Sequence, residues 1–137
     1  MVNFGCDADG GAICTVKDGK LVTLKLLGCV VFYFKRGNLF LDISGNMDEY
    51  YETIYSFLGG GFKAIHKGTY GAADNANIQF DKNGDPIYEY YWDGKKVSYS
   101  AYQDSLSAAF DQSKAIDTES MKSDAAKIIA KIKAFRY

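Results

Sequence analysis

The chain has 137 residues, of which 47% are hydrophobic and 24% are charged, and its formal net charge is −1. This size and composition predict a single globular domain over 1–137, with a core that needs neither disulfides nor a metal. Acidic and basic residues are interspersed, which argues against a nucleic-acid partner because such proteins usually carry a basic face. No run approaches the roughly 20 apolar residues of a membrane span, so we expect none.

The N-terminus and the cysteines bear on the cellular compartment. The first residues have neither the basic start nor the apolar stretch of a secretory signal. We expect a cytoplasmic protein if Met1 is the authentic start, and a cell-surface or secreted one if an export segment has been removed. Cys6, Cys14 and Cys29 lack CxxC spacing, and His66 alone cannot complete a zinc site. We expect buried free thiols, with a disulfide as the alternative, and no cofactor.

Glycine-containing turns divide the chain as far as residue 97. Pairs such as Asp18-Gly19, Asn83-Gly84 and Asp93-Gly94 supply the positive φ of tight hairpins. Runs rich in Val, Ile, Tyr, Phe and Thr lie between them, which predicts an antiparallel β-meander of seven to nine strands over 11–97. The predicted strands are Ala12–Lys17, Lys20–Leu27, Cys29–Lys35, Asn38–Ile43, Tyr50–Leu58, Phe62–Tyr70, Asn77–Asp81, Pro86–Trp92 and a short Lys95–Val97.

Residues 47–58 fit two kinds of secondary structure. Their apolar side chains also have helical spacing, Asn46 with Glu49 resembles a capping box, and Gly59 is a good helix terminator. The β-branched and aromatic content favours a strand, and so does a weak internal repeat whose period is close to that of one four-stranded unit. We therefore predict a strand here, and two propeller-blade-like units within the meander.

After Trp92 the hydrophobic period becomes helical, so the predicted class is α+β. We expect C-terminal helices within 98–137, near 99–112 and 119–134, that cover one face or end of the sheet. Ser98 or Ser100 is the expected N-cap of the first helix. The apolar stripes are Tyr102, Leu106, Ala109 and Phe110, then Met121, Ala125, Ile128, Ile129, Ile132 and Phe135. The expected core contains Leu24, Leu26, Phe32, Phe34, Leu41, Ile65, Leu106, Phe110, Ile128 and Ile132.

Two segments carry a resemblance to known domains. Ile87-Tyr-Glu-Tyr-Tyr-Trp-Asp-Gly-Lys-Lys-Val-Ser-Tyr-Ser-Ala-Tyr-Gln-Asp-Ser-Leu resembles a recurrent ending of surface-associated, lipoprotein-like domains of Gram-positive gut bacteria. Lys17-Asp-Gly-Lys-Leu-Val-Thr-Leu is similar to their hairpins. The resemblance implies a β-meander followed by a helix, and a function that is generally unassigned. Those domains often begin with a calcium-binding Asp-rich loop, of which Asp7-Ala-Asp9-Gly10-Gly11 keeps only part.

One loop has a spacing that short calcium sites use. Oxygen-bearing side chains fall at positions 1, 3, 5 and 9, so that alternate side chains converge on a hard cation. Pro86 stands where such loops usually have glycine, and Asn-Gly is a strong hairpin signal. We interpret the segment as a polar hairpin tip and leave calcium as the alternative. The residues are Asp81, Asn83, Asp85 and Glu89.

The sequence contains no phosphate loop, nucleophile elbow or zinc-protease motif, so we expect no enzyme. His66 is interpreted as a strand residue with a satisfied hydrogen bond. The chain has 11 Tyr, 9 Phe and one Trp. Tyrosine suits both half-buried sheet faces and partner-binding surfaces.

These observations predict a non-enzymatic binding or interaction domain with a protein or glycan partner. The alternative is a small intracellular partner protein, such as the immunity protein of a toxin pair. The expected binding surface is aromatic and acidic, with Glu52 or Glu89 nearby, although sheet packing also explains these aromatics. The predicted binding residues are Tyr50, Tyr51, Tyr88, Tyr90 and Trp92.

Overall fold

The computed structural model of the chain describes residues 2–7, 10–28, 30–34 and 37–117, together with 126, 127 and 130. Its strands are β1 Val2–Asp7, β2 Gly10–Lys17, β3 Lys20–Lys25, β4 Val30–Phe34, β5 Leu39–Asn46, β6 Glu49–Leu58, β7 Gly61–Ala72, β8 Tyr88–Trp92, β9 Lys95–Val97 and β10 Ile116–Asp117. An α-helix, α1 Tyr99–Ala109, and a short 3-10 helix, η2 Gln112–Lys114, follow β9.

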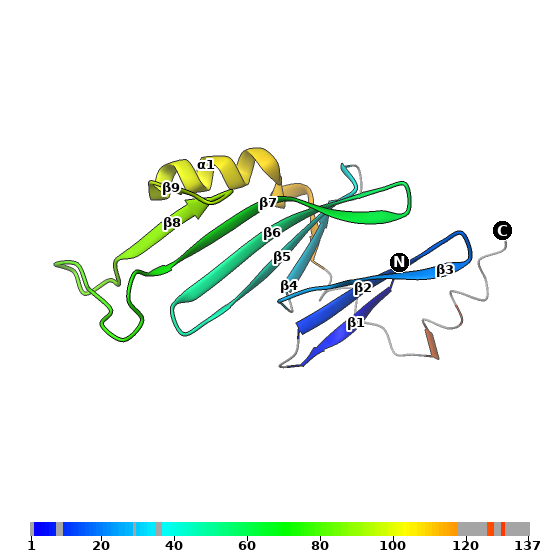
Figure 1. Ribbon diagram of the computed structural model, residues 1–137, viewed down its shortest axis with the longest axis horizontal. Coiled ribbons are helices and arrows are strands. Elements are labelled where there is room, and N and C mark those ends of the chain that lie inside the picture. Colours follow the sequence, from blue (N-terminus) through cyan, green and yellow to red (C-terminus); the bar gives the residue numbers. More distant parts are fainter. Residues whose placement is uncertain are drawn as a thin grey trace.

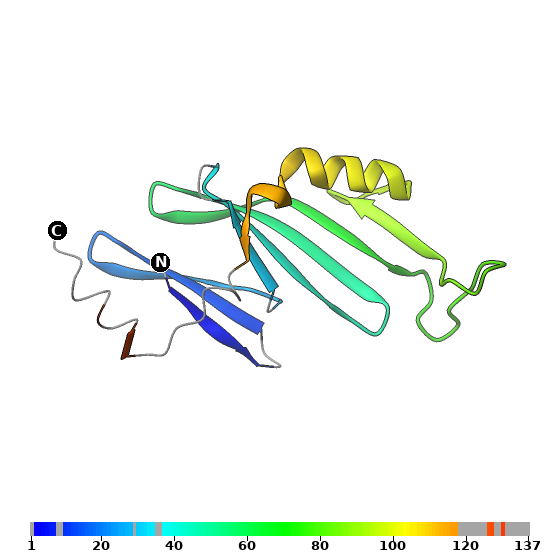
Figure 2. The same cartoon turned by 180° about the vertical axis from the view of Figure 1, so that it is seen from behind.

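These strands form two antiparallel sheets. β1, β2 and β3 make a three-stranded sheet, and the seven-stranded sheet has the order β10-β4-β5-β6-β7-β8-β9. From β4 to β9 each strand pairs with the next one along the chain, so most of the large sheet is a meander of hairpins (Figure 1). β10 returns to β4, where Ile116 pairs with Tyr33 (Figure 2). The predicted fold class, α+β with antiparallel strands, is therefore confirmed.

One finer prediction about the architecture is wrong, and another falls mostly outside the described residues. The strands do not form two propeller-blade-like units, because the chain leaves the small sheet after β3 and starts the large one at β4. Within the described residues one α-helix, α1, covers the large sheet, and the second predicted helix, near 119–134, lies almost entirely outside them. The Ser98 hydroxyl caps α1 by accepting from the Ala101 amide, as predicted. No helix in the described part of the chain is long and apolar enough to cross a membrane.

The ambiguous segment 47–58 is a strand, as predicted, but Asn77–Asp81 is not. In the latter, Phe80 makes only an isolated bridge with Pro86. The Asp81 carboxylate accepts hydrogen bonds from the Asn83 and Asp85 amides, at 2.7 and 3.0 Å. Such local side-chain bonds compete with a strand ladder, and here they stabilise a loop instead.

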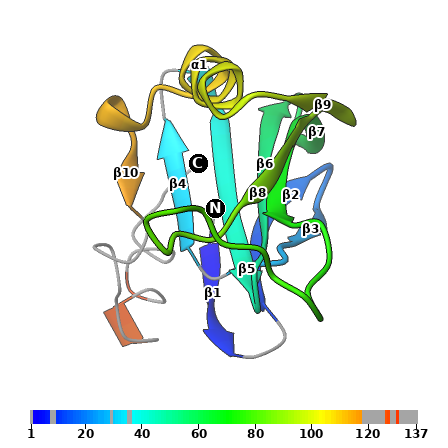
Figure 3. The same ribbon diagram turned by 90° about the vertical axis from the view of Figure 1, so that its left-hand side faces the viewer.

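Both faces of the large sheet carry apolar side chains. On β4, Val31 and Tyr33 face the small sheet, whereas Phe32 and Phe34 face the helical side. The first core cluster joins the two sheets through Ile13, Leu26, Val31 and Phe40. The second lies under the C-terminal end of α1 and contains Leu41, Ile54 and Phe110. The helix and the small sheet thus cover opposite faces of the large sheet, and both cover β4, β5 and β6 (Figure 3).

Most of the predicted core residues are buried or pack against the core. Leu26, Leu41 and Phe110 are buried, and the half-buried ones pack against them, namely Leu24, Phe32, Phe34 and Leu106. Ile128 and Ile132 lie outside the described residues.

The prediction for Ile65 is wrong, because it is 37% exposed. A bulge explains this exposure: Ile54 pairs with His66 but the next residue, Tyr55, pairs with Ala64. Ile65 therefore has no cross-strand partner, and the simple alternation of faces fails at this position.

A buried aspartate fixes the crossing from the small sheet to the large one. Asp42 of β5 is 2% exposed, and its carboxylate accepts hydrogen bonds from the Leu27 and Gly28 amides, both at 3.0 Å. Burial raises the pKa of Asp42, and the two amide bonds oppose this rise. A Cβ on Gly28 would lie 1.9 Å from the carbonyl oxygen of Ile43. The crossing therefore needs glycine at position 28.

We expect Gly28→Ala to destabilise the fold by on the order of 3 kcal/mol, because its methyl group would meet backbone that cannot move without breaking the Asp42 bonds. Gly61→Ala is the matched control, since the nearest atom to its added Cβ would be 3.8 Å away. Urea unfolding measures both variants. Equal stabilities of the two variants would contradict this account of the crossing.

Candidate functional site

Three tyrosines lie side by side on the face of the large sheet that carries α1. Tyr50 of β6, Tyr70 of β7 and Tyr90 of β8 are direct cross-strand partners. The ring centroids of Tyr50 and Tyr70 are 4.7 Å apart with 16° between the planes, and those of Tyr70 and Tyr90 are 5.5 Å apart with 18°. The rings are therefore stacked, and we call this row the tyrosine ladder. Each of the three residues is half-buried and keeps part of its surface exposed.

Two further tyrosines flank the ladder. The ring of Tyr88 lies 5.9 Å from that of Tyr50, and its hydroxyl donates to Asp48 Oδ1 at 2.6 Å. This hydrogen bond raises the pKa of the Tyr88 hydroxyl above its ordinary value. Tyr99, at the start of α1, lies 5.3 Å from Tyr90 and is 60% exposed. The ladder with Tyr88 and Tyr99 is the tyrosine face.

Tyr102 of α1 attaches the helix to this part of the sheet. Gly68 lies between Glu52 and Trp92 in the cross-strand row beside the ladder. A Cβ on Gly68 would lie 2.3 Å from the Tyr102 hydroxyl, so the glycine leaves the space that this side chain fills. Tyr102 is 0% exposed, and its hydroxyl donates to Glu52 Oε2 at 2.6 Å. Burial raises the pKa of Glu52, and the bond from Tyr102 opposes that rise.

Trp92 packs against Tyr102 and against the single histidine, His66. Its ring meets Tyr102 edge-on at 5.7 Å and stacks on His66 at 5.6 Å. His66 Nδ1 lies 2.9 Å from Asp93 Oδ2, and the other carboxylate oxygen accepts from the Lys67 amide. The bond with His66 lowers the pKa of Asp93. His66 is thus a strand residue with a satisfied hydrogen bond, as the sequence predicts.

The predicted binding residues do not form one surface. Tyr50, Tyr88 and Tyr90 come together in the tyrosine face. Trp92 lies on the same side but packs against the core beneath α1. Tyr51 lies on the opposite side of the sheet, because side chains alternate along β6.

The opposite side has a smaller polar arrangement of its own. The hydroxyls of Tyr51 and Tyr91 donate to Glu49 and Glu89, at 2.9 and 2.7 Å. Lys96 pairs with Glu89, and this hydrogen bond lowers the pKa of Glu89. Of the two acidic residues expected beside the site, Glu52 is therefore on the ladder side and Glu89 is not.

Sequence reasoning missed Tyr70, Tyr99 and Tyr102 as members of this region. Tyr70 could have been found as an aromatic residue of a predicted strand, but its partners could not, because a bulge shifts the β6–β7 register and the loop 73–87 joins β7 to β8. Gly68 gave a weaker signal, since glycine inside a strand often marks a close approach of another element. That element is the Tyr102 side chain.

The metal and thiol candidates have structural roles. In the candidate calcium loop the Asp81 carboxylate binds amides of its own turn, and Glu89 pairs with Lys96. Within the described residues, no three His, Cys, Asp or Glu side chains gather closely enough to hold a metal. Cys14 is a buried free thiol whose sulfur lies 3.3 Å from the Thr23 hydroxyl. The side chains of Cys6 and Cys29 are not among those that the structure describes.

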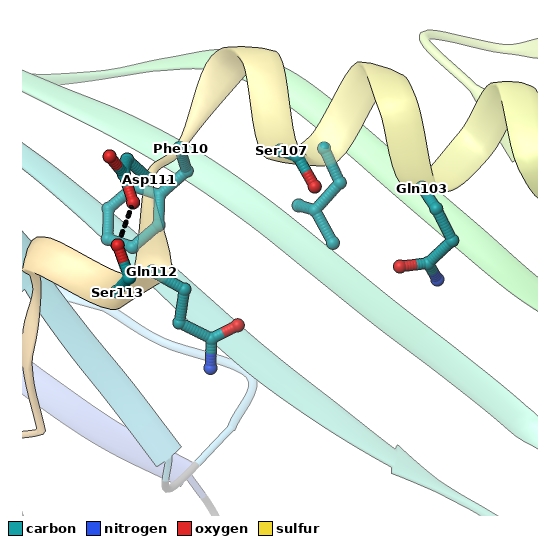
Figure 4. A pocket seen from close by; sticks show the side chains of 7 residues that line it. Gln103, Ser107, Phe110, Asp111, Gln112 and Ser113 are labelled. Carbon is teal, nitrogen blue, oxygen red and sulfur yellow. Dashed lines mark hydrogen bonds between the residues drawn. The ribbon is translucent and has the colours of Figure 1, made fainter.

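A shallow hollow of about 260 Å³ lies where α1 turns into η2 (Figure 4). Its polar lining is neutral apart from Asp111, which accepts a hydrogen bond from Ser113 at 2.6 Å and pairs with Lys114. Phe110 forms part of the wall but is 2% exposed, so it offers little surface to a ligand. The lining residues are Gln103, Leu106, Ser107, Phe110, Asp111, Gln112 and Ser113.

Comparisons with known proteins identify no relative of this chain. No protein-family model matches it, and neither does any curated protein or solved structure. The resemblance to lipoprotein-like domains therefore stays a prediction, and the site has to be interpreted from its own geometry.

We expect Tyr102→Phe to lower the free energy of unfolding by about 2 kcal/mol, because it removes the hydroxyl that hydrogen-bonds the half-buried Glu52 carboxylate. Tyr99→Phe is the control, since the Tyr99 side chain lies on the same helix but is largely exposed. Urea titration followed by tryptophan fluorescence measures both. A Tyr102→Phe protein as stable as Tyr99→Phe would show that the hydrogen bond contributes nothing.

Glu52→Gln tests the electrostatics of the same contact. Folding raises the pKa of Glu52 above 4.5, so its contribution to stability is complete below about pH 4.5 and is lost as pH rises through the raised pKa. Glutamine keeps an oxygen acceptor for Tyr102 and cannot ionise. The stability of Glu52→Gln relative to the unchanged chain should therefore increase between about pH 4 and pH 7. Denaturant unfolding at each pH measures the unfolding free energy of both proteins. A difference between the two free energies that does not change with pH would refute the prediction.

Proposed function

We propose that this chain is a non-enzymatic binding domain that recognises a protein partner through the tyrosine face. One observation carries the proposal: five tyrosines from three strands and a helix share one surface, yet none of them is fully buried. Tyrosine provides a large contact area at small entropic cost and has a polar end that meets water in the free state. Exposed aromatic surface of this kind is typical of partner sites.

The stacking favours a protein over a glycan. A sugar packs its C–H groups against the electron-rich face of an aromatic ring. Tyr50 and Tyr90 stack on the two faces of the Tyr70 ring, at centroid distances of 4.7 and 5.5 Å, so each of them also has one face covered. The ladder therefore presents ring edges and hydroxyl groups, which suit the mixed apolar and polar surface of a peptide.

The histidine supports a non-enzymatic role. The ring of His66 stacks on Trp92, and its Nδ1 pairs with Asp93 in the turn after β8. Asp93 also binds the Lys67 amide, so the group joins β7 to the β8–β9 turn. These contacts give His66 a use in the fold, and this use needs no catalysis.

We also propose that the chain is related to the surface-associated, lipoprotein-like domains that its sequence resembles, and that 119–134 forms a second helix. The segment that carries the resemblance forms β8, a turn with positive φ at Asp93 and Gly94, β9 and α1 capped by Ser98. This order is the strand, turn and helix that the resemblance implies.

Selection from an unbiased peptide-display library tests the proposed function. We expect the selected binders to lose most of their affinity for Tyr50→Ser and to keep it for Tyr51→Ser. The two tyrosines are neighbours in β6 on opposite sides of the sheet, so they form a matched pair. Circular dichroism checks that both variants are folded. Binders that tolerate Tyr50→Ser, or a library that yields none, would overturn the proposal.

A further inference from the structure

We propose that the tyrosine face binds a proline-rich, basic segment of its partner, laid across the strands in the polyproline II conformation. This inference rests on the proposed function and names the chemistry of the partner. Proline-rich segments dock on aromatic surfaces because their extended helix is already formed and loses little entropy on binding. The tyrosine ladder and its surroundings fit such a segment in spacing, in shape and in charge.

The spacing of the ladder matches that of the ligand. Neighbouring strands lie about 4.8 Å apart, so Tyr50 and Tyr90, on strands separated by β7, lie about 9.6 Å apart. Polyproline II has three residues per turn and rises about 3.1 Å per residue, so one side of it repeats every ~9.3 Å. Successive prolines on one side of the segment can therefore meet equivalent positions along the ladder.

The surface is open along this direction. The cross-strand partner of Tyr50 on β5 is Gly45, which has no side chain to close the ladder at that end. In the described residues β4 pairs with β5 only as far as Ile43, so none of the described strands pairs with β5 at Gly45 on that side. At the other end Tyr99 of α1 extends the aromatic surface past Tyr90. The aromatic surface thus extends from Tyr50 to Tyr99, with Tyr88 and Tyr102 beside it.

The charge beside the ladder is acidic. The largely exposed loop 73–87 connects β7 to β8 and ends where β8 begins (Figure 1). It carries Asp74, Asp81 and Asp85 against the single lysine Lys82. Asp48, which accepts the hydrogen bond from Tyr88, adds a further carboxylate. Arginine or lysine residues next to the prolines would meet this charge, so a basic segment is favoured over an acidic one.

Three synthetic peptides of equal length test the inference: proline-rich with arginines, proline-rich with glutamates in their place, and glycine–serine with the same arginines. Calorimetry gives the affinities. We expect the first peptide to bind at least about tenfold more tightly than the other two. Tyr50→Ser should weaken its binding about tenfold, and Tyr51→Ser should leave it within about twofold. If Tyr50→Ser does not fold, Tyr99→Ser replaces it, because Tyr99 is largely exposed.

Any of three outcomes overturns the inference. One is equal binding of the glycine–serine and proline-rich arginine peptides, because attraction would then be electrostatic only. The second is no binding of the proline-rich arginine peptide. The third is an equal loss of its affinity in Tyr50→Ser and Tyr51→Ser. The library separates these failures from failure of the proposed function. Binders without proline that are lost in Tyr50→Ser would refute the proline-rich ligand alone, whereas binders indifferent to that change would refute the tyrosine face as the site.

Discussion

The contact between Tyr102 and Glu52 determines how the helix lies on the sheet. Tyr102 is fully buried, and its hydroxyl reaches a carboxylate 50 positions earlier in the chain. Gly68 makes room for that side chain, so a missing Cβ on β7 fixes the place where α1 crosses. With the helix held there, Tyr99 lies beside Tyr90 and the three ladder tyrosines stay half-buried. The same contact therefore stabilises the fold and shapes the proposed site.

The offset between the two covering layers explains why an aromatic surface stays exposed. α1 covers one face from β8 to β4, and the small sheet covers the opposite face at β4, β5 and β6. Asp42 fixes the small sheet against the large one, because its buried carboxylate accepts hydrogen bonds from the amides of the crossing from β3 to β4. Neither layer extends over the whole sheet, so β6, β7 and β8 keep polar and aromatic side chains in contact with solvent.

Local patterns predicted the hairpins well and the arrangement of the sheets poorly. Turn pairs such as Asp93-Gly94 set the strand boundaries, because positive φ is a local property. The separation into two sheets depends on Gly28 and Asp42, whose contact is not visible in any short window of sequence. Within the predicted site, Tyr50, Tyr88 and Tyr90 were placed together correctly. Tyr51 was not, since its face follows from an alternation that the aromatic cluster alone does not show.

The meander also has a consequence for the order of folding. Each strand from β4 to β9 pairs with its successor, so these contacts have short separations in sequence and low contact order. Most of the loops that close them are short, the exception being loop 73–87 between β7 and β8, and each hairpin brings the next strand near. The pairing of β10 with β4 and the contact of Tyr102 with Glu52 join distant segments. The strands β6, β7 and β8 can therefore assemble before α1 docks. Until then, the helix does not cover any part of the tyrosine ladder.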